Sequence, residues 1–433
     1  MHSITKAARL NSFPDTSVWL EFSPLATYTK SINLGQGFPG WQPPGFVQEA
    51  IVKAVTDKRY FQYARSSGQP HLCEKIAELY SGLHKRNICP QKEILVTVGA
   101  SEAIILALLA FINPGDEVIL IEPYFDIYAY AIKMAGGIPK YIPLRMPKNI
   151  SQASDLYLDI DELENIITPK TKAMILNSPH NPTGKVFTTA EYRQIAAVLE
   201  SHSQIVVISD EVYENLIFPG SEHIPFATTP GMETRTISIY SAGKTFAVTG
   251  WKIGWVIAPP QLMKPLQTTQ QWVVFAVANP LQEAVALCLE QAERPYKDFH
   301  NYYLDLQCLY NKKKNIMMTN LVAAGLTPIE PQGSFFILAK IDNQTFNLNE
   351  PPKNYETLTA KHGIAVDPKT ANDKSYNFCR HLTVEKGITP IPPTAFYSEK
   401  HKYLGENYAR FAFCKEDEEL VYAGQKLQTL IDP

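Results

Sequence analysis

The middle of the chain alternates short apolar segments with helical patterns, and this alternation restricts the fold more than any other feature. Apolar segments of strand length occupy residues 94–98, 117–121 and 140–143, and others lie near residues 173, 205, 236 and 253. Helical patterns begin at Ser101 and Asp126. Strands and helices in alternation usually build a mostly parallel sheet with helices on both faces. The sequence therefore predicts an α/β fold.

The two ends of the chain lie outside this pattern. The 433 residues exceed the size at which one hydrophobic core keeps growing, so we expect two lobes, and a hydrophobic content of 45% is enough to fill both. Residues 340–376 form one long polar stretch, rich in Asn, Lys, Pro and Asp. We interpret it as a solvated excursion with a helix around residues 354–362.

Charge and cysteine content exclude several classes of function. A net charge of -3 and a pI near 6.4 favour neither nucleic acid nor anionic membrane as a partner, so small molecules and a second copy of the chain are expected. The longest apolar run, residues 103–112, is half of a bilayer span and predicts a buried helix.

The six cysteines lack metal-ligand spacing, so we expect reduced thiols, no metal and an intracellular location. A cytoplasmic location is expected; the acid-free first 14 residues, with Lys6 and Arg9, leave a mitochondrial one open.

Lys244 follows an apolar, β-branched segment and lies in a turn of small residues. A lysine amine in an enclosed pocket can lose its proton and form a Schiff base with a carbonyl. Ser241 offers a hydroxyl group and Lys252 a positive charge, and together they suit a phosphate that would orient an aldehyde against Lys244. For this segment alone, a surface lysine in a glycine turn is the commoner explanation.

Two other strand ends supply matching chemistry. Asp210 ends the apolar segment that starts at Ile205, and ligands of open α/β sheets bind at such ends. A carboxylate about 4 Å from a protonated pyridine nitrogen would stabilise it by roughly 4 kcal/mol, or about three pKa units. Tyr213 and Asn181 offer a phenol and an amide for a ring hydroxyl group, although each alone suits ordinary turn chemistry.

These motifs resemble those of a known family. Asn-Pro-Thr-Gly at residues 181–184, Ser-Asp-Glu-Val-Tyr at 209–213 and Ser-Ala-Gly-Lys-Thr-Phe at 241–246 are similar to the class I pyridoxal 5'-phosphate aminotransferases of fold type I. Segments 33–39, 115–126, 184–187, 249–255 and 331–336 resemble the group of kynurenine aminotransferases, glutamine transaminase K and cysteine-conjugate β-lyases. The resemblance runs from about residue 19 to 415.

The resemblance implies pyridoxal 5'-phosphate (PLP) as cofactor and a domain plan. Residues 56–295 would form the large PLP-binding domain, and residues 296–433 would form the small α+β domain with part of the N-terminal arm, 1–55. Lys244, Asp210 and Tyr213 would be catalytic.

The phosphate site draws on several further residues. Backbone N–H groups of Gly99, Ala100 and Ser101 open a helix and would point at the phosphate. By resemblance, Phe125 would stack on the cofactor ring, with its neighbour Tyr124 as the alternative. Tyr63 matches a tyrosine that reaches the phosphate of the neighbouring subunit, which implies a homodimer with shared active sites.

The resemblance also implies how a substrate is held. Arg410 matches the residue that pairs with the substrate α-carboxylate, with Gly37 and Asn181 beside it. Trp19 and Phe275, with Tyr63, would form aromatic pocket walls that favour large neutral or aromatic amino acids such as kynurenine and glutamine. Ala276 and Ser101 depart from residues found in part of the group, histidine and tyrosine, so the preferred substrate stays open.

The expected activity is a ping-pong transfer of the amino group to a 2-oxo acid. The alternatives are a cysteine-S-conjugate β-lyase that uses the same cofactor chemistry and a non-catalytic binding module. Every candidate catalytic position carries the residue that the chemistry needs, which argues against a non-catalytic module.

Overall fold

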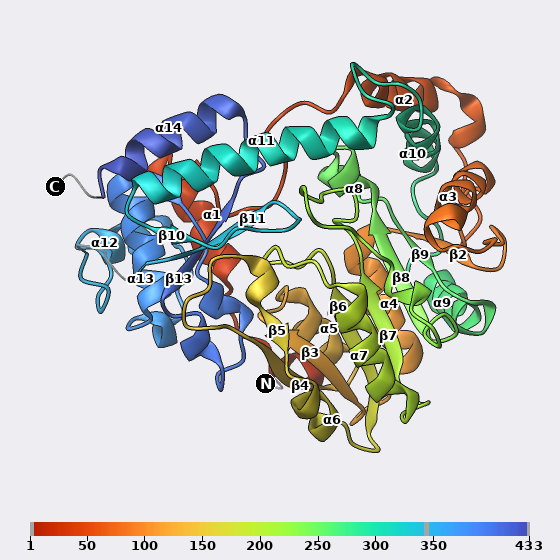
Figure 1. The fold of residues 1–433 in the computed structure, drawn as a ribbon, viewed down its shortest axis with the longest axis horizontal. Helices are drawn as coiled ribbons and strands as arrows, with labels where there is room; N and C mark the ends of the chain where they lie inside the picture. The colour runs from red at the N-terminus through yellow and green to blue at the C-terminus, as the bar shows by residue number, and fades with distance from the viewer. Residues whose placement is uncertain (1–3, 342–345, 431–433) are drawn as a thin grey trace.

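Eight strands form the central sheet, in the order β2-β9-β8-β7-β6-β3-β4-β5. The computed structural model describes residues 4–341 and 346–430 (Figure 1). Parallel pairing joins β4 to β3, β3 to β6, β6 to β7 and β7 to β8, whereas β9 and the edge strand β5 run antiparallel to their neighbours. The mostly parallel sheet predicted from the sequence is confirmed. The strands are β2 (Ile94–Thr97), β3 (Glu117–Glu122), β4 (Ile138–Arg145), β5 (Tyr157–Leu158), β6 (Thr171–Asn177), β7 (Val206–Asp210), β8 (Thr236–Ser241) and β9 (Gly254–Ile257).

Helices cover both faces of this sheet, because successive strand residues point to opposite faces. On β3, Val118 and Leu120 pack in a core with α4, α5 and α9, while Ile119 and Ile121 pack with α6 and α7. These helices are α4 (Gly99–Phe111), α5 (Ile127–Met134), α6 (Ile160–Ile166), α7 (Thr189–Glu200) and α9 (Pro260–Val273). Helix α4 begins two residues before the predicted start.

Both ends of the chain build the smaller domain. Its three-stranded sheet has the order β10-β11-β13, and β1 of the N-terminal arm pairs with β12 near the C-terminus. The elements are α1 (Val18–Thr29), β1 (Ile32–Asn33), β10 (Thr327–Pro328), β11 (Phe336–Lys340), α12 (Tyr355–His362), α13 (Lys374–His381), β12 (Ile388–Thr389), β13 (Tyr408–Ala412) and α14 (Asp417–Gln428). Helix α12 confirms the helix predicted in the polar stretch 340–376, of which residues 342–345 lie outside the described residues.

A long helix, α11 (Tyr302–Ala323), crosses between the two domains (Figure 1). Two further helices of the first half, α2 (Gly45–Thr56) and α3 (Pro70–Leu83), both pack against α10 (Asn279–Ala292). The proposed domain boundary at residue 55 therefore falls within the last turn of α2. The short α8 (Ala242–Thr245) follows β8 at the junction of the domains.

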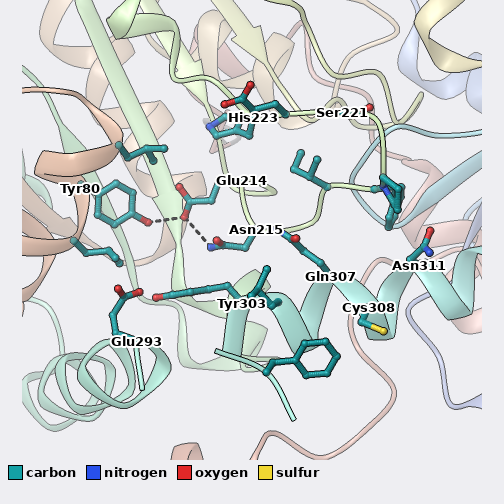
Figure 2. A pocket seen from close by; sticks show the side chains of 18 residues that line it. Tyr80, Glu214, Asn215, Ser221, His223, Glu293, Tyr303, Gln307, Cys308 and Asn311 are labelled. Carbon is teal, nitrogen blue, oxygen red and sulfur yellow. Dashed lines mark hydrogen bonds between the residues drawn. The ribbon is translucent and has the colours of Figure 1, made fainter. Parts of the chain in front are cut away.

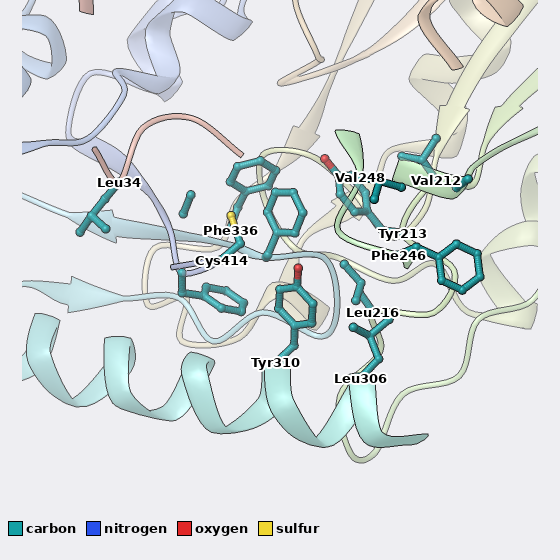
Figure 3. Close-up of a cluster of buried hydrophobic side chains, with 14 of the residues drawn as sticks. Leu34, Val212, Tyr213, Leu216, Phe246, Val248, Leu306, Tyr310, Phe336 and Cys414 are labelled. Atoms are coloured by element: carbon teal, nitrogen blue, oxygen red, sulfur yellow. The ribbon is translucent and has the colours of Figure 1, made fainter. Parts of the chain in front are cut away.

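One apolar cluster spans that junction. Figure 3 shows Leu306 and Tyr310 of α11 facing Phe336 of β11 and the segments that follow β7 and α8. Burial of such side chains stabilises each by about 1.5–3 kcal/mol, so the domains share part of their core. In the described part of the chain, no helix is both long and apolar enough to cross a membrane. All six cysteines are free thiols.

Candidate active site

Three neighbouring strands end on polar residues at one edge of the central sheet. Asn177 is the last residue of β6, Asp210 of β7 and Ser241 of β8. The carboxyl ends of parallel strands meet at the same edge, where open α/β sheets bind ligands. All three residues line one cavity of about 220 Å³. The fold thus gathers residues that are distant in sequence.

The Lys244 amine lies in this cavity on the short helix α8. Its Nζ donates a hydrogen bond to the backbone oxygen of Gly37 at 3.1 Å and lies 5.5 Å and 5.1 Å from the ring centres of Tyr213 and Phe335. Burial lowers the pKa of Lys244 to about 8. About a tenth of the amine is therefore neutral, and hence nucleophilic, at pH 7, far more than at an unshifted lysine.

Asp210 is buried, with 4% of its surface exposed. Burial raises the pKa of its carboxyl group to about 6, against the opposing effect of a hydrogen bond from Tyr128. The Tyr128 hydroxyl group donates to Oδ2 at 2.5 Å, and the Val212 N–H donates to Oδ1 at 3.3 Å. A carboxylate held in this way is ready to pair with a cationic group.

An anion cradle opens beside these groups at the start of α4. Gly99, Ala100 and Ser101 form the first turn, and all three line the cavity together with Lys252. Gly99 has a φ of +71°, and a Cβ atom added there would lie 3.2 Å from Lys252 Nζ. Glycine is therefore needed both for the backbone conformation and for the close approach of the lysine. A helix start with a lysine beside it suits a phosphate group.

Arg410, on β13 of the smaller domain, reaches the same cavity and is 1% exposed. Its Nη1 donates to Asn181 Oδ1 at 2.9 Å and its Nη2 to the Gly35 backbone oxygen at 2.6 Å. The guanidinium group lies 4.1 Å from the Phe336 ring centre. Burial lowers the pKa of Arg410 to about 10, so it stays cationic at neutral pH. Within the described residues its Nε has no hydrogen-bond partner, which leaves a buried donor for a ligand.

Trp19, Gly37 and Phe125 complete the walls of the cavity. The Trp19 indole N–H donates to Asp126 Oδ2 at 2.7 Å, which fixes the ring. A Cβ atom on Gly37 would lie 2.5 Å from the Phe335 ring, so a larger residue does not fit there. Phe125 lines the cavity whereas Tyr124 stacks on Tyr141 elsewhere, so the structure favours Phe125 over its neighbour.

Tyr63 and Phe275 do not line this cavity. Their rings contact each other, with centres 5.2 Å apart, and the residues are 83% and 55% exposed. Within one chain, the structure therefore does not bring them to the other predicted site residues. Their predicted roles stay predictions.

Sequence reasoning missed other residues that line the cavity, among them Tyr128, Asn177 and Phe336. Tyr128 follows Phe125 by three residues, a spacing that places two side chains on one face of a helical turn, so a signal was present. Asn177 ends a strand in the same way as Asp210. Its Oδ1 accepts the backbone N–H of Asn181 at 2.7 Å, and its Nδ2 donates to the Asp210 backbone oxygen at 2.9 Å.

A family model described as aminotransferase class I and II matches residues 29–426. The chain belongs to this family. It is an aminotransferase, and aminotransferases of this family generally depend on PLP and act on amino acids and 2-oxo acids.

Relatives of known structure or name support this membership. The kynurenine--oxoglutarate transaminase of Dictyostelium discoideum is 42% identical over 98% of this aminotransferase and 96% of its own length. Kynurenine--oxoglutarate transaminase 3 of Homo sapiens is 40% identical over 96% and 88%. The crystal structure of Saccharomyces cerevisiae Bna3p, a candidate kynurenine aminotransferase, is 33% identical, covers 99% of both chains and has a TM-score of 0.89.

The residues present in this aminotransferase fit PLP. Lys244 offers an amine for the aldehyde, and the buried Asp210 offers a negative charge for the ring nitrogen. The start of α4, where Gly99 permits the close approach of Lys252, offers backbone N–H groups and a lysine for a phosphate. The buried, unpartnered Nε of Arg410 fits a second anion, the carboxylate of an amino acid.

Proposed function

We propose that this aminotransferase binds PLP at Lys244 and moves the amino group of a large neutral or aromatic amino acid, such as kynurenine or glutamine, to a 2-oxo acid. One observation carries the proposal. An amine, a carboxylate and a guanidinium group, from Lys244, Asp210 and Arg410, line a single cavity with an anion cradle. The names of the relatives, which are kynurenine--oxoglutarate transaminases, support this choice of substrate.

Each of these side chains has a defined part in the reaction. When bound, the cofactor supplies an electron sink for the substrate Cα. Lys244 Nζ, with its lowered pKa, would accept the proton from the substrate Cα and deliver a proton to the carbon that receives the amino group. The Asp210 carboxylate holds a proton at the ring nitrogen through charge pairing. The Tyr213 phenol, whose pKa burial raises, remains a neutral hydrogen-bond donor for the ring hydroxyl group.

Arg410 orients the substrate relative to Lys244. Its planar guanidinium group pairs with both oxygens of a carboxylate, and Asn181 and the Gly35 carbonyl group fix its position. The rings of Trp19 and Phe336 lie 5.6 Å and 4.1 Å from its centre and exclude water around the pair. Aromatic walls of this kind favour large neutral or aromatic side chains.

An absorbance experiment tests the reaction class. The purified PLP-loaded protein is mixed with kynurenine, glutamine or a cysteine conjugate singly, without a 2-oxo acid. Conversion of the cofactor spectrum to that of pyridoxamine phosphate, with release of one equivalent of 2-oxo acid, supports transamination. Continuous formation of pyruvate and ammonia from the conjugate would instead favour the β-lyase. Lys244→Ala should lose both the lysine-linked absorbance and nearly all turnover, and retention of either would refute the assignment.

We further propose that the protein is a homodimer in which Tyr63 contacts the cofactor phosphate of the partner. Exposed aromatic and apolar residues near Tyr63 support this, because an extended apolar surface marks an interface. Asn279 Nδ2 donates to the Gln62 backbone oxygen at 3.0 Å, so the segments on either side of this bond lie together. The exposed residues are Phe61 (61%), Tyr63 (83%), Trp272 (80%), Val273 (54%) and Phe275 (55%).

Hybrid dimers test the shared site. A chain with Lys244→Ala is mixed with a chain with Tyr63→Ala under conditions that exchange subunits. If Tyr63 acts across the dimer, each hybrid has one intact site, so activity exceeds the sum of the two unmixed variants. Activity that equals this sum would contradict the shared site, and light scattering of the wild type would show the dimer mass independently.

A further inference from the structure

A second cavity, of about 680 Å³, lies next to the active site on the other side of the segment that follows β7. Its walls come from α3, residues 214–223 and the first half of α11 (Figure 2). It shares no lining residue with the active-site cavity. Its volume lies in the range of sites that enclose a small organic ligand.

The lining of this second cavity is aromatic and acidic. The rings of Tyr80, Phe218, Phe299 and Tyr303 contribute to it. Besides its two tyrosines, the ionisable residues of the lining are Glu214, Glu222, Glu293, His223 and Cys308, and within the described chain neither Lys nor Arg is among them. Lys314 lies 5.1 Å from the Phe218 ring centre, but its charge is paired with Glu330 at 2.8 Å. Electrostatics therefore favour a cation and disfavour a carboxylate.

A buried carboxyl oxygen in this cavity lacks a partner. Glu214 is 8% exposed, and its Oε1 accepts hydrogen bonds from the Tyr80 hydroxyl group at 2.5 Å and from Asn215 Nδ2 at 3.3 Å, as drawn in Figure 2. Its Oε2 has no hydrogen-bond partner in the described residues, and neither do the Tyr303 hydroxyl group and His223 Nδ1. Buried polar atoms in native proteins are nearly always paired, so three such atoms at one cavity indicate a missing polar ligand.

We propose that this cavity is a second binding site and that its ligand is an organic ammonium ion with an apolar or aromatic body. The N–H group of the ligand would donate to Glu214 Oε2, and its body would lie among the aromatic rings. Amino acids and 2-oxo acids carry a carboxylate that the acidic lining repels. The active site, with Arg410, has the opposite preference, so the two cavities select different ligands.

The second site is connected to the catalytic lysine through short links. Glu214 directly follows Tyr213, and Asn215 Nδ2 donates both to Glu214 Oε1 and to Thr245 Oγ1, each at 3.3 Å. Thr245 directly follows Lys244, and its backbone oxygen accepts the Tyr302 hydroxyl group at 2.8 Å. Asn215 thus joins the second site to the residue that follows Lys244. If a ligand on Glu214 shifts Lys244 through these bonds, cofactor and ammonium ligand alter each other's affinity by the same factor.

The Glu214 carboxyl group also makes the affinity for the proposed ligand depend on pH. Burial, and the nearby charge of Glu211, raise the pKa of Glu214 well above its ordinary value. An ammonium ion that pairs with the ionised carboxylate lowers this pKa, so its affinity rises with pH through the range in which Glu214 titrates. The other titratable groups around Glu214 are Tyr80 on α3, Tyr240 on β8, Tyr303 on α11, Glu293 after α10, and Glu211 and His223 on its own segment. Burial raises the pKa values of the three tyrosines, which keeps them neutral.

Isothermal titration calorimetry with N,N-dimethyl-2-phenylethylamine tests the proposal on the PLP-loaded protein. This tertiary amine carries one N–H group and cannot condense with an aldehyde, so the outcome does not depend on the proposed active-site function. We expect one site per chain with a Kd below about 1 mM, and affinity that increases with pH. The matched anion, 3-phenylpropionate, should not bind at this site.

Two perturbations locate the binding. Glu214→Gln keeps the shape but removes the charge, and should weaken binding by at least about tenfold and abolish the pH dependence. Cys308, an exposed thiol of the lining, allows the mouth to be blocked with a bulky maleimide. Blocking should abolish binding to the wild-type protein but not to Cys308→Ser treated identically, which keeps the test valid if Glu214→Gln does not fold. No binding of the amine up to about 10 mM, anion binding that the Cys308 block abolishes, or amine binding unaffected by the block would overturn the proposal; anion binding that survives the block belongs to the Arg410 site.

Discussion

We expect the hydrogen bond from Tyr128 to Asp210 to set the acid limit of activity in this aminotransferase, if Asp210 has the proposed role. The phenol donates to Asp210 Oδ2 at 2.5 Å in a buried setting, and the pKa of Asp210 is about 6 with this bond in place. A hydrogen bond to a charged group stabilises it by about 1.5–3 kcal/mol. Since one pKa unit corresponds to about 1.36 kcal/mol, its removal raises the pKa by about one to two units.

Tyr128→Phe removes the bond with little change of volume. In the unliganded protein the pKa of Asp210 should rise from about 6 to about 7–8. The Asp210 carboxylate must be ionised for its proposed role, so activity is lost at pH values below its pKa. In Tyr128→Phe the acid limb of the pH profile therefore moves to higher pH. A bound cofactor cation would lower the pKa in both proteins, so the difference between them is the quantity to measure.

The assay is kcat/KM for one amino donor from about pH 5 to pH 9, because this ratio reports the essential groups of the free enzyme. Tyr157→Phe is the matched control, since Tyr157 is 51% exposed and is not among the residues that line the cavity. Its profile should coincide with that of the wild type. Acid limbs of Tyr128→Phe and wild type that agree within about 0.3 units would refute the reasoning.

Three other expectations concern the cofactor and substrate groups. Because burial lowers the pKa of Lys244 to about 8, the rate of PLP uptake by the apoprotein should rise about tenfold per pH unit up to pH 8 and then level off, as measured by stopped-flow absorbance; a flat profile below pH 8 would contradict this. Arg410→Lys loses the two-oxygen pairing, so kcat/KM should fall about 10–100-fold with unchanged cofactor absorbance, and near-normal activity would argue against the carboxylate role. Gly99→Ala places a Cβ atom 3.2 Å from Lys252 Nζ at a φ of +71°, so the Kd for PLP in a fluorescence titration should rise by about tenfold. Gly45→Ala, which meets nothing within 4 Å, is its control and should leave the Kd unchanged.

Much of the site was predictable because its residues occupy positions with a local signature. Asp210 and Ser241 end apolar strands, and Gly99 begins a helix directly after a strand. Each of these signals depends on the alternation of apolar side chains and on backbone preferences over a few residues. The pairing of parallel strands alone places their carboxyl ends side by side. This is why Lys244, which follows β8, and Asp210, at the end of β7, line the same cavity.

Contacts between remote side chains were not predictable in this way. The bond from Tyr128 to Asp210 joins residues 82 positions apart, and the bond from Arg410 to Asn181 joins residues 229 positions apart. The first bond depends on how α5 packs on the central sheet, and the second on how the two domains pack. Both depend on which rotamers the packing allows. Tyr63 and Phe275 lie outside the cavity of their own chain. The contact of Tyr63 with the site of a second chain, which the resemblance implies, stays a prediction.

The sequence by itself determined the alternation of strands and helices, the polar strand ends and the family resemblance, because short-range sterics and side-chain periodicity act within a few residues. Only the tertiary structure decided which atoms meet: the Tyr128 phenol on Asp210, the Gly37 carbonyl group on Lys244, and a second acidic cavity around Glu214. These features depend on packing between segments that are far apart in the sequence and on the burial that this packing produces. The same burial moves the pKa values of Lys244 and Asp210 toward neutrality.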